Sequence, residues 1–288
     1  MRVALLGLGL MGRALGERLQ QEGFDLHGWN RSAAGAEAAR AAGLRVHPRA
    51  ADAAAGADAL LLALADAAAI EAVLFAAEAP PALAGRLVIQ TGTIAPEESR
   101  ALGARVEAAG GTWLEAPVLG SRPEARAGTL ILMAGGTPEA FARALPLLLA
   151  LGPEPRLVGP VGQGAALKLA MNQLIAALTT GFAQSLGLVR AEGVDVGLFM
   201  ELLRHSALYA PTFDKKLQRY LTHDYGDPNF PLQHLLKDTA LFEGVAARAG
   251  QETAVVAAMR RLFERACAAG LAGQDYSALY EALNGGTG

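Results

Sequence analysis

Residues 2–23 read RVALLGLGLMGRALGERLQQEG, and this stretch decides how the first half of the chain folds. The apolar run from Arg2 to Leu6 predicts a buried strand, and an amphipathic helix is predicted after the glycines. Gly7 suits a tight turn, Gly9 lets the backbone approach a pyrophosphate, and Gly12 lets helix and strand pack closely. We therefore expect a dinucleotide site whose phosphates lie at the helix N-terminus. Its residues are Gly7, Leu8, Gly9, Leu10, Met11 and Gly12.

The second predicted strand, Asp25 to Trp29, ends in Asn30, Arg31 and Ser32. An NAD site usually has an acidic residue here, which binds the ribose hydroxyls. A carboxylate would repel a 2′-phosphate, whereas the guanidinium of Arg31 can pair with it. We therefore expect NADP (NADPH) rather than NAD, with all three residues in contact with it. The alternative, that Arg31 only begins a loop, is not favoured by its place directly after the strand.

Strands and helices continue to alternate as far as residue 158. The further strands are predicted at 45–47, 58–64, 86–90, 112–116, 129–133 and 156–158. This alternation predicts a doubly wound parallel sheet of the Rossmann type, in which an antiparallel edge strand can also occur. Ligands of such sheets lie beyond the carboxyl ends of the strands, where three segments are found. They are Leu64-Ala65-Asp66, residues 91–93 and a loop over residues 117–122, and ordinary turn chemistry would also explain their composition.

Residues 162–192 predict one long helix, and no convincing strand follows it. The helix has no charged residue from Leu169 to Val189, and its second face is mostly Ala, Gly and Thr, so we expect it to be buried nearly all round. Scattered polar residues such as Asn172 and Gln184 argue against a membrane span. We therefore predict an α/β domain over 1–161 and an all-α domain over 162–288, joined by this helix.

Composition excludes several function classes. The chain has 288 residues and a net charge of −3, which gives no electrostatic case for nucleic acid or an anionic membrane. Its single cysteine, Cys267, excludes an internal disulfide and fits a reducing, cytoplasmic location. No metal site is expected. The remaining helices of the second half are too few to cover the long one completely, which predicts a homodimer or homotetramer.

Lysine usage points to two positions. The chain has four lysines against 21 arginines, and only lysine can lose its proton when it is desolvated. Lys215 and Lys216 have the sequence context of a solvated helix face. Lys168 lies in the apolar helix, with Asn172 one turn later on the same face. Lys237 lies in an apolar helix start, where a salt bridge with neighbouring acids would also explain it.

Five ordered motifs resemble the β-hydroxyacid dehydrogenase family, the relatives of 3-hydroxyisobutyrate dehydrogenase and 6-phosphogluconate dehydrogenase. They are GLGLMG (7–12), TGTIAPEES (91–99), EAPVLGSRPEARAGTLILMAGG (115–136), GQGAALKLAMNQ (162–173) and FPLQHLLKD (230–238). The resemblance covers essentially the whole chain, and its wording is most similar to the glyoxylate and succinic semialdehyde reductase branch. It implies an NAD(P)-dependent oxidoreductase that acts on a small carbonyl compound or hydroxyacid.

The resemblance also implies roles for single residues. Lys168 is similar to the catalytic lysine, and Asn172 to the neighbour that helps to hold the substrate. Thr93 and Lys237 match positions that contact the cofactor near its nicotinamide. Gly120 and Ser121 resemble the cradle of the substrate carboxylate, where Leu119 stands in place of the usual serine. This departure allows a bulkier or less polar substrate.

The mechanism implied is hydride transfer from NADPH to a carbonyl carbon, with Lys168 as general acid, or as base in reverse. An imine reductase on the same fold is a second hypothesis. Lys168 argues against it, since that group usually has Asp or Tyr there, while Leu119 keeps it open. A non-catalytic NADP-binding scaffold is the third, against which the retention of Lys168 and Lys237 argues.

Overall fold

The computed structural model describes residues 1–285, and its contacts divide the chain into two compact units. The first unit runs from Met1 to Lys168, and the second begins at Leu169. The division falls inside helix α8 (Gln163–Ala191), which has 29 residues. The long helix predicted from the charge-free run is therefore present, and it carries the chain from one unit into the other.

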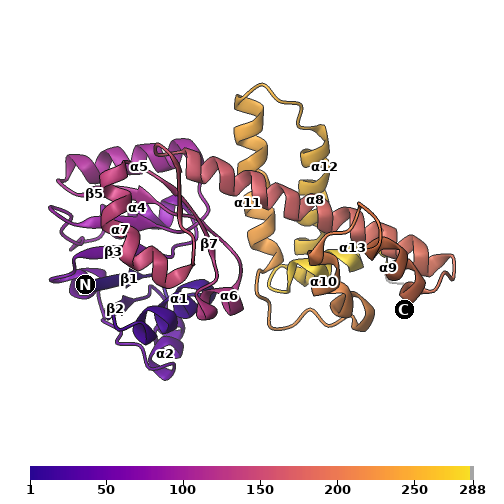
Figure 1. Ribbon diagram of the computed structural model, residues 1–288, viewed down its shortest axis with the longest axis horizontal. Coiled ribbons are helices and arrows are strands. Elements are labelled where there is room, and N and C mark those ends of the chain that lie inside the picture. The colour runs from indigo at the N-terminus through magenta and orange to yellow at the C-terminus, as the bar shows by residue number, and fades with distance from the viewer. Residues whose placement is uncertain (286–288) are drawn as a thin grey trace. The chain divides into compact units, whose positions relative to one another are not determined.

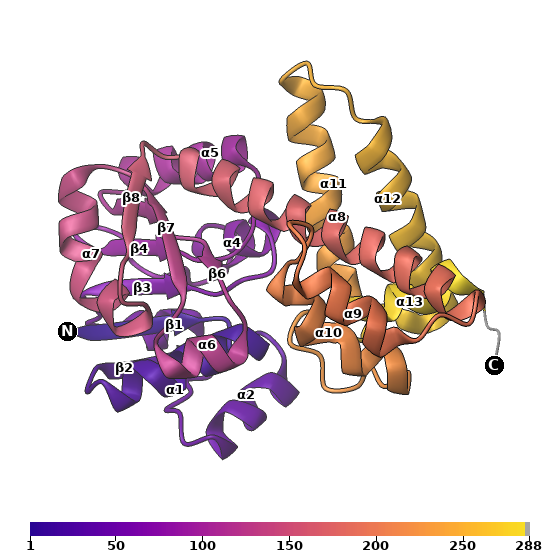
Figure 2. The same cartoon turned by 45° about the vertical axis from the view of Figure 1, so that its right-hand side comes forward.

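The first unit is built on one mixed sheet (Figures 1 and 2). Its strands are β1 (Arg2–Leu6), β2 (Asp25–Trp29), β3 (Ala59–Leu62), β4 (Leu87–Gln90), β5 (Thr112–Glu115), β6 (Val118–Leu119), β7 (Ile131–Gly135) and β8 (Arg156–Gly159). They are ordered β2-β1-β3-β4-β5-β7-β6, and β8 pairs with β7. Strands β1 to β5 are parallel, whereas β7 is antiparallel to β5 and to β6. The predicted doubly wound sheet with an antiparallel edge is confirmed.

Helices cover both faces of this sheet. They are α1 (Leu10–Gln21), α2 (Ala33–Ala41), α3 (Ala50–Ala54), α4 (Ala67–Leu74), α5 (Pro96–Ala108), α6 (Arg122–Ala127) and α7 (Pro138–Leu151). Side chains alternate along each strand, so β1 supplies both layers. Val3 and Leu5 pack in the core that α1, α6 and α7 share, and Ala4 and Leu6 pack in the core of α3, α4 and α5.

Two local predictions in the first unit are wrong. Residues 45–47 form no strand but a single bridge, Gly28 to Val46, because Pro48 follows directly and cannot donate to a ladder. Residues 117–122 are not one loop, since they contain β6 and the start of α6. The signal for α6 was present in Pro123 and in Glu124, which accepts a hydrogen bond from the backbone N–H of Ser121.

The second unit is helical, as predicted. After α8 it contains α9 (Val196–Arg204), α10 (Pro211–Thr222), α11 (Leu232–Arg248), α12 (Ala254–Ala266), the π-helix η1 (Cys267–Leu271), the 3-10 helix η2 (Tyr276–Ala278) and α13 (Leu279–Asn284). Between Leu169 and Gly285 the only strand pairing is one isolated bridge, Pro231 to Asp275. Two apolar clusters form its core, centred on Phe263 and Phe182.

The prediction that α8 is buried nearly all round is wrong. Leu174, Leu178 and Leu188 are 57%, 37% and 64% exposed, because the other helices of the unit cover only the side that carries Ala176, Phe182 and Leu186. By length and hydropathy α8 would also be able to cross a bilayer. A single helix of this kind is weak evidence for that, since core helices of soluble proteins share these properties.

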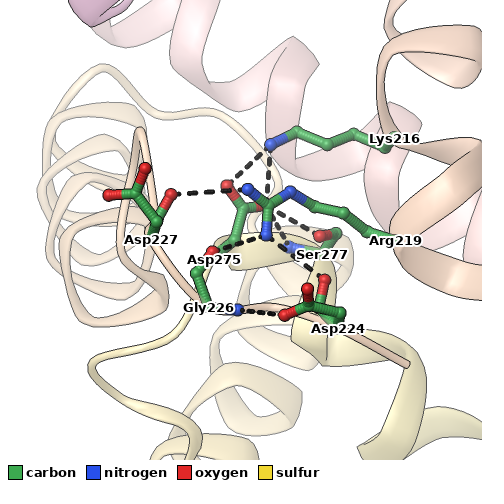
Figure 3. Close-up of polar contacts among 7 residues, drawn as sticks. All are labelled: Lys216, Arg219, Asp224, Gly226, Asp227, Asp275 and Ser277. Atoms are coloured by element: carbon green, nitrogen blue, oxygen red, sulfur yellow. Dashed lines mark hydrogen bonds and ion pairs between the residues drawn. The ribbon is translucent and has the colours of Figure 1, made fainter. Parts of the chain in front are cut away.

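Lys216 corrects a further expectation, because it does not lie on a solvated face (Figure 3). It is 5% exposed, and its Nζ lies 2.7 Å from both carboxylate oxygens of Asp275, which is fully buried. The backbone N–H and hydroxyl of Ser277 donate to the same carboxylate. Burial lowers the pKa of Lys216 from its ordinary value, and the charge of Asp275 opposes that shift. The pair therefore joins α10 to the segment that begins η2.

Candidate active site

The carboxyl ends of five strands form one row in the first unit. In register, Leu6 lies beside both Trp29 and Leu62, Leu62 beside Gln90, and Gln90 beside Glu115. The hydrogen bonds continue one residue past the strands, as in Gly7 N–H to Trp29 O (2.9 Å) and Thr91 N–H to Leu62 O (3.0 Å). The turns that follow these strands therefore begin side by side, at the edge where ligands of parallel sheets bind.

The glycine turn has the geometry that its sequence predicts. Gly7 has φ +101°, and a Cβ there would collide with the carbonyl oxygen of Ala63. A Cβ on Gly12 would collide with the carbonyl oxygen of Gly7. By contrast, the space next to Gly9 is open, and no side chain caps the N-terminus of α1. The turn thus leaves room and backbone N–H groups for a pyrophosphate, which fits the predicted cofactor.

Asn30 connects the end of β2 to the glycine turn. Its Oδ1 accepts from the N–H of Leu8 (2.9 Å), and its Nδ2 donates to the hydroxyl of Ser32 (3.1 Å). The side chain therefore holds the glycine turn in place from the end of β2. Ser32 also caps α2 by accepting from Gly35 N–H, while Arg31 is exposed. Arg31 and the N-terminus of α2 remain as groups that can meet a phosphate.

The turns after β3 and β4 lie against each other. Asp66 caps α4 by accepting from Ala69 N–H at 2.7 Å. A Cβ on Gly92 would lie 2.5 Å from the carbonyl oxygen of Leu64, so glycine is needed for this approach. Thr93 follows and is half-buried. The structure thus brings residues 64–66 and Thr93 to adjoining turns of the row.

The segment with the predicted carboxylate cradle is held by strand pairing and by hydrogen bonds to Glu124. Leu119 lies in β6 opposite Ile131 of β7, and Gly120 has φ +131°. The hydroxyl and the backbone N–H of Ser121 both donate to Glu124 Oε2, at 2.5 and 2.8 Å. Because its proton is committed to Glu124, the Ser121 hydroxyl offers a ligand mainly its acceptor lone pairs.

Glu115, which the sequence analysis did not single out, holds the start of α8. It is the last residue of β5 and is fully buried. Its Oε1 accepts from the backbone N–H groups of Gly162 (2.8 Å) and Ala165 (3.1 Å), and its Oε2 accepts from the Ser99 hydroxyl. The long helix therefore starts at the carboxyl edge of the sheet. Lys168, three residues beyond Ala165, is buried at 7% exposure.

In the second unit, Asn172 and Lys237 meet at one carboxylate. Asn172 Nδ2 donates to Asp238 Oδ2 (2.6 Å), and Lys237 Nζ lies 2.8 Å from Asp238 Oδ1. The salt bridge foreseen as an alternative for Lys237 is thus present. Among the described residues, no hydrogen bond reaches Asn172 Oδ1, although the atom is buried. Asp238 was expected only as a salt-bridge partner of Lys237, and its contact with Asn172 was not foreseen.

No metal site accompanies these residues in the described part of the chain. Between residues 1 and 285, no three His, Cys, Asp or Glu side chains are grouped as a metal ion would need. His234, the histidine nearest in sequence to Lys237, stacks on Phe230 with ring centroids 6.3 Å apart. Burial lowers its pKa from the ordinary value, so it is a neutral packing residue at neutral pH.

Two protein-family models match the chain and together span nearly all of it. Residues 2–159 match the NAD-binding domain of 6-phosphogluconate dehydrogenase. Residues 162–283 match the model described as NAD-binding of NADP-dependent 3-hydroxyisobutyrate dehydrogenase. The first match covers the sheet with its row of turns, and the second covers the helical half with Lys168, Asn172 and Lys237.

Characterised relatives agree with these matches. Glyoxylate/succinic semialdehyde reductase 2 of Arabidopsis thaliana is 29% identical over 98% of this chain and 79% of its own length. NAD-dependent L-serine dehydrogenase of Pseudomonas aeruginosa is 30% identical over 96% of this chain and 95% of its own. The solved 3-hydroxyisobutyrate dehydrogenase of Mycobacterium tuberculosis with L-serine superposes with a TM-score of 0.83, at 25% identity and 98% coverage of both chains. The chain therefore belongs to the β-hydroxyacid dehydrogenase family, as an NAD(P)-dependent oxidoreductase that acts on CH–OH groups.

Proposed function

We propose that this protein uses NADPH to reduce a small aldehyde or keto acid, and in reverse oxidises a β-hydroxyacid. The observation that carries the proposal is the buried lysine, Lys168, on a helix whose first turn is held at the carboxyl edge of the sheet. Burying an ammonium costs free energy, and a lysine kept at such a position is suited to proton transfer to a carbonyl oxygen.

The nicotinamide, when bound, supplies the hydride, and the chain manages the proton. As hydride reaches the carbonyl carbon, negative charge grows on the oxygen, and the Lys168 ammonium donates a proton to it. In reverse, the neutral amine takes the proton from the hydroxyl. Asn172 is fixed by Asp238 so that its Oδ1 is left as an acceptor. That acceptor suits a hydroxyl or another donor on the substrate.

The cofactor preference is proposed from the end of β2. Arg31 is exposed beside the N-terminus of α2, and no carboxylate occupies positions 30–32. A 2′-phosphate would gain a charged partner there without repulsion. Arg31→Ala removes one charged hydrogen-bond partner worth about 1.5–3 kcal/mol, so the KM for NADPH rises at least tenfold while that for NADH changes little. Wild-type protein that prefers NADH would overturn this preference.

One assay tests the reaction itself. Oxidation of NADPH is followed with glyoxylate, succinic semialdehyde, methylmalonate semialdehyde and a cyclic imine. Lys168→Ala should lower kcat by about 10²–10⁴, the usual contribution of a general acid. Full activity of this variant would refute the assignment of Lys168 as the general acid. NADPH that binds stoichiometrically but is turned over with none of the four compounds would support a non-catalytic scaffold instead.

Leu119 is the position that we expect to select the substrate. It offers no hydroxyl to a carboxylate, and the neighbouring Ser121 hydroxyl is committed to Glu124. Leu119→Ser should therefore increase kcat/KM for glyoxylate relative to the larger aldehydes. This apolar residue also favours the second candidate, an imine reductase. Turnover of the cyclic imine that exceeds that of every aldehyde would replace the first candidate by the second.

We also propose that the protein self-associates through α8 and α9. The exposed residues of α8 between Ala170 and Leu188 carry no charge, and Leu198 and Leu202 of α9 are 49% and 64% exposed. A two-fold interface places like residues near each other, so a charge-free surface suits a second copy of the chain. Sedimentation should give a dimer or tetramer, and Leu174→Glu with Leu188→Glu should give a monomer. A monomeric wild type, or one that floats with phosphatidylcholine vesicles, would refute this.

A further inference from the structure

The clamp on α8 is made by a residue far away in sequence. An N-terminal cap is normally the residue at the helix start. Here the acceptor is the side chain of Glu115, and it is 47 and 50 residues away from the two N–H groups that it binds. The cap therefore connects α8 to the sheet rather than only satisfying its first turn.

The surroundings of the clamp are shaped for a carboxylate. A Cβ on Gly135 of β7 would collide with Glu115 Oε1, and a Cβ on Gly164 of α8 would lie 3.0 Å from the same atom. The second oxygen is bound by Ser99, whose hydroxyl in turn lies 3.4 Å from Trp113 Nε1. Both oxygens are thus occupied, and the two glycines let backbone approach Oε1 closely.

Two hydrogen bonds to Glu115 fix the position of α8 more completely than one would. Gly162 and Ala165 are three residues apart, so their N–H groups lie on nearly the same side of the helix start. Binding both to one oxygen limits sliding of α8 along its axis and rotation about it. Lys168 lies less than one turn beyond Ala165, where any such movement is passed on almost unchanged to its side chain.

We infer that Glu115 is a positioning residue for Lys168, which it holds in place through the start of α8. The inference rests on the proposed role of Lys168 in proton transfer. A displacement of about 1 Å in a reacting group can lower a rate about a hundredfold. Loss of the clamp should therefore reduce turnover even where the fold and the cofactor site are intact.

The principal variant is Glu115→Gln, which keeps the size of the side chain and one carbonyl acceptor. We expect kcat with NADPH and the best of the four carbonyl substrates to fall at least tenfold. The KM for that substrate and the dissociation constant of NADPH should change less than threefold, with one NADPH still bound per chain. That stoichiometry excludes a misfolded fraction as the cause. Unchanged kcat would overturn the inference.

Asp195→Asn is the matched control, because Asp195 also caps a helix with its carboxylate, at Leu198 N–H (2.7 Å) in α9. It should leave kcat within twofold of the wild type. Ser99→Ala removes the partner of Oε2 and leaves the charge of Glu115 in place. It should lower kcat by a smaller factor than Glu115→Gln. Equal losses in Glu115→Gln and Asp195→Asn would show a general effect of cap removal and would overturn the inference.

A measurement without turnover separates this inference from the proposed function. In Glu115→Gln, hydrogen exchange at the amides of residues 162–168 should be at least tenfold faster, while exchange in α1 is unchanged. Unaltered exchange at residues 162–168 would overturn the inference that Glu115 holds the start of α8. This outcome would count even if the variant were inactive or poorly folded by other probes. If Lys168→Ala retains full activity while exchange does accelerate, the proposed function fails and the clamp stands as a structural one.

Discussion

The ion pair between Lys216 and Asp275 allows a quantitative test of how the helical unit is stabilised. Both partners are buried, at 5% and 0% exposure, and Nζ lies 2.7 Å from each carboxylate oxygen. Lys216→Met keeps most of the apolar volume but leaves the Asp275 carboxylate without its cation. Lys215→Met is the matched control, because the neighbouring lysine is exposed.

Removing one member of a buried pair costs about 3–5 kcal/mol, because the other charge stays buried. Asp275 keeps two hydrogen bonds from Ser277, which places our expectation for Lys216→Met near the lower limit, about 3 kcal/mol. The double variant Lys216→Met with Asp275→Asn leaves no buried charge, and it should recover at least about 1 kcal/mol of this loss. Lys215→Met should stay within about 0.5 kcal/mol of the wild type.

The distribution of aromatic residues allows the two units to be followed separately. Both tryptophans, Trp29 and Trp113, belong to the first unit, and all five tyrosines belong to the second. Urea unfolding is therefore recorded by tryptophan fluorescence and by tyrosine absorbance on the same sample. Lys216→Met should shift only the tyrosine transition. A shift equal to that of Lys215→Met, or a double variant as unstable as the sum of its single variants, would refute the reasoning.

Three further predictions concern the cofactor turn, His27 and Asp238. Gly12→Ala should destabilise the first unit by about 1–3 kcal/mol in the tryptophan transition, because its Cβ collides with Gly7 O. Gly9→Ala has open space and should weaken only NADPH binding, measured by fluorescence titration; equal stability losses would contradict this contrast. Burial, and then the charge of Arg2, lowers the pKa of His27 from 6.5, so the fold prefers the neutral ring and the first unit should lose stability as the pH falls below 6.5. His27→Gln should flatten this dependence of the urea midpoint, and an unchanged slope would show that other groups cause it. Asp238→Asn removes a charged acceptor worth about 1.5–3 kcal/mol from Asn172, so the substrate KM should rise between tenfold and a hundredfold, whereas an unchanged KM would count against Asn172 as a substrate contact.

Sequence patterns that act within a few residues predicted most of the fold. The strand, the glycine turn and the helix of residues 2–21 are present as predicted, because side-chain period and the special backbone of Gly7 act within a few residues. The change from alternating strands to helices after β8 was visible for the same reason. Residues 45–47 were misassigned because Pro48, which cannot donate to a ladder, limits this segment to a single bridge.

The candidate site could be predicted only for residues whose position follows from the strand or motif to which they belong. Arg31 and residues 64–66 follow strands, so their place at the carboxyl edge came from topology alone. The contacts of Asn30 with Leu8 could not be foreseen, although the two belong to adjoining strand ends. The contact of Asp238 with Asn172 was not foreseen, because an acid next to a lysine on a helix is usually a solvated pair, and only packing showed that it is buried.

The sequence by itself determined the order of elements, the doubly wound sheet and the lysine on which the proposed chemistry depends. Tertiary structure alone decided which polar groups lie beyond the reach of water. Lys216 and Asp275 are 59 residues apart, and Glu115 and Gly162 are 47 apart. The exposed apolar side of α8 was also decided by tertiary structure, because it depends on where the later helices pack. Burial is a property of all neighbours together, and contacts over such separations arise only when the whole chain has folded.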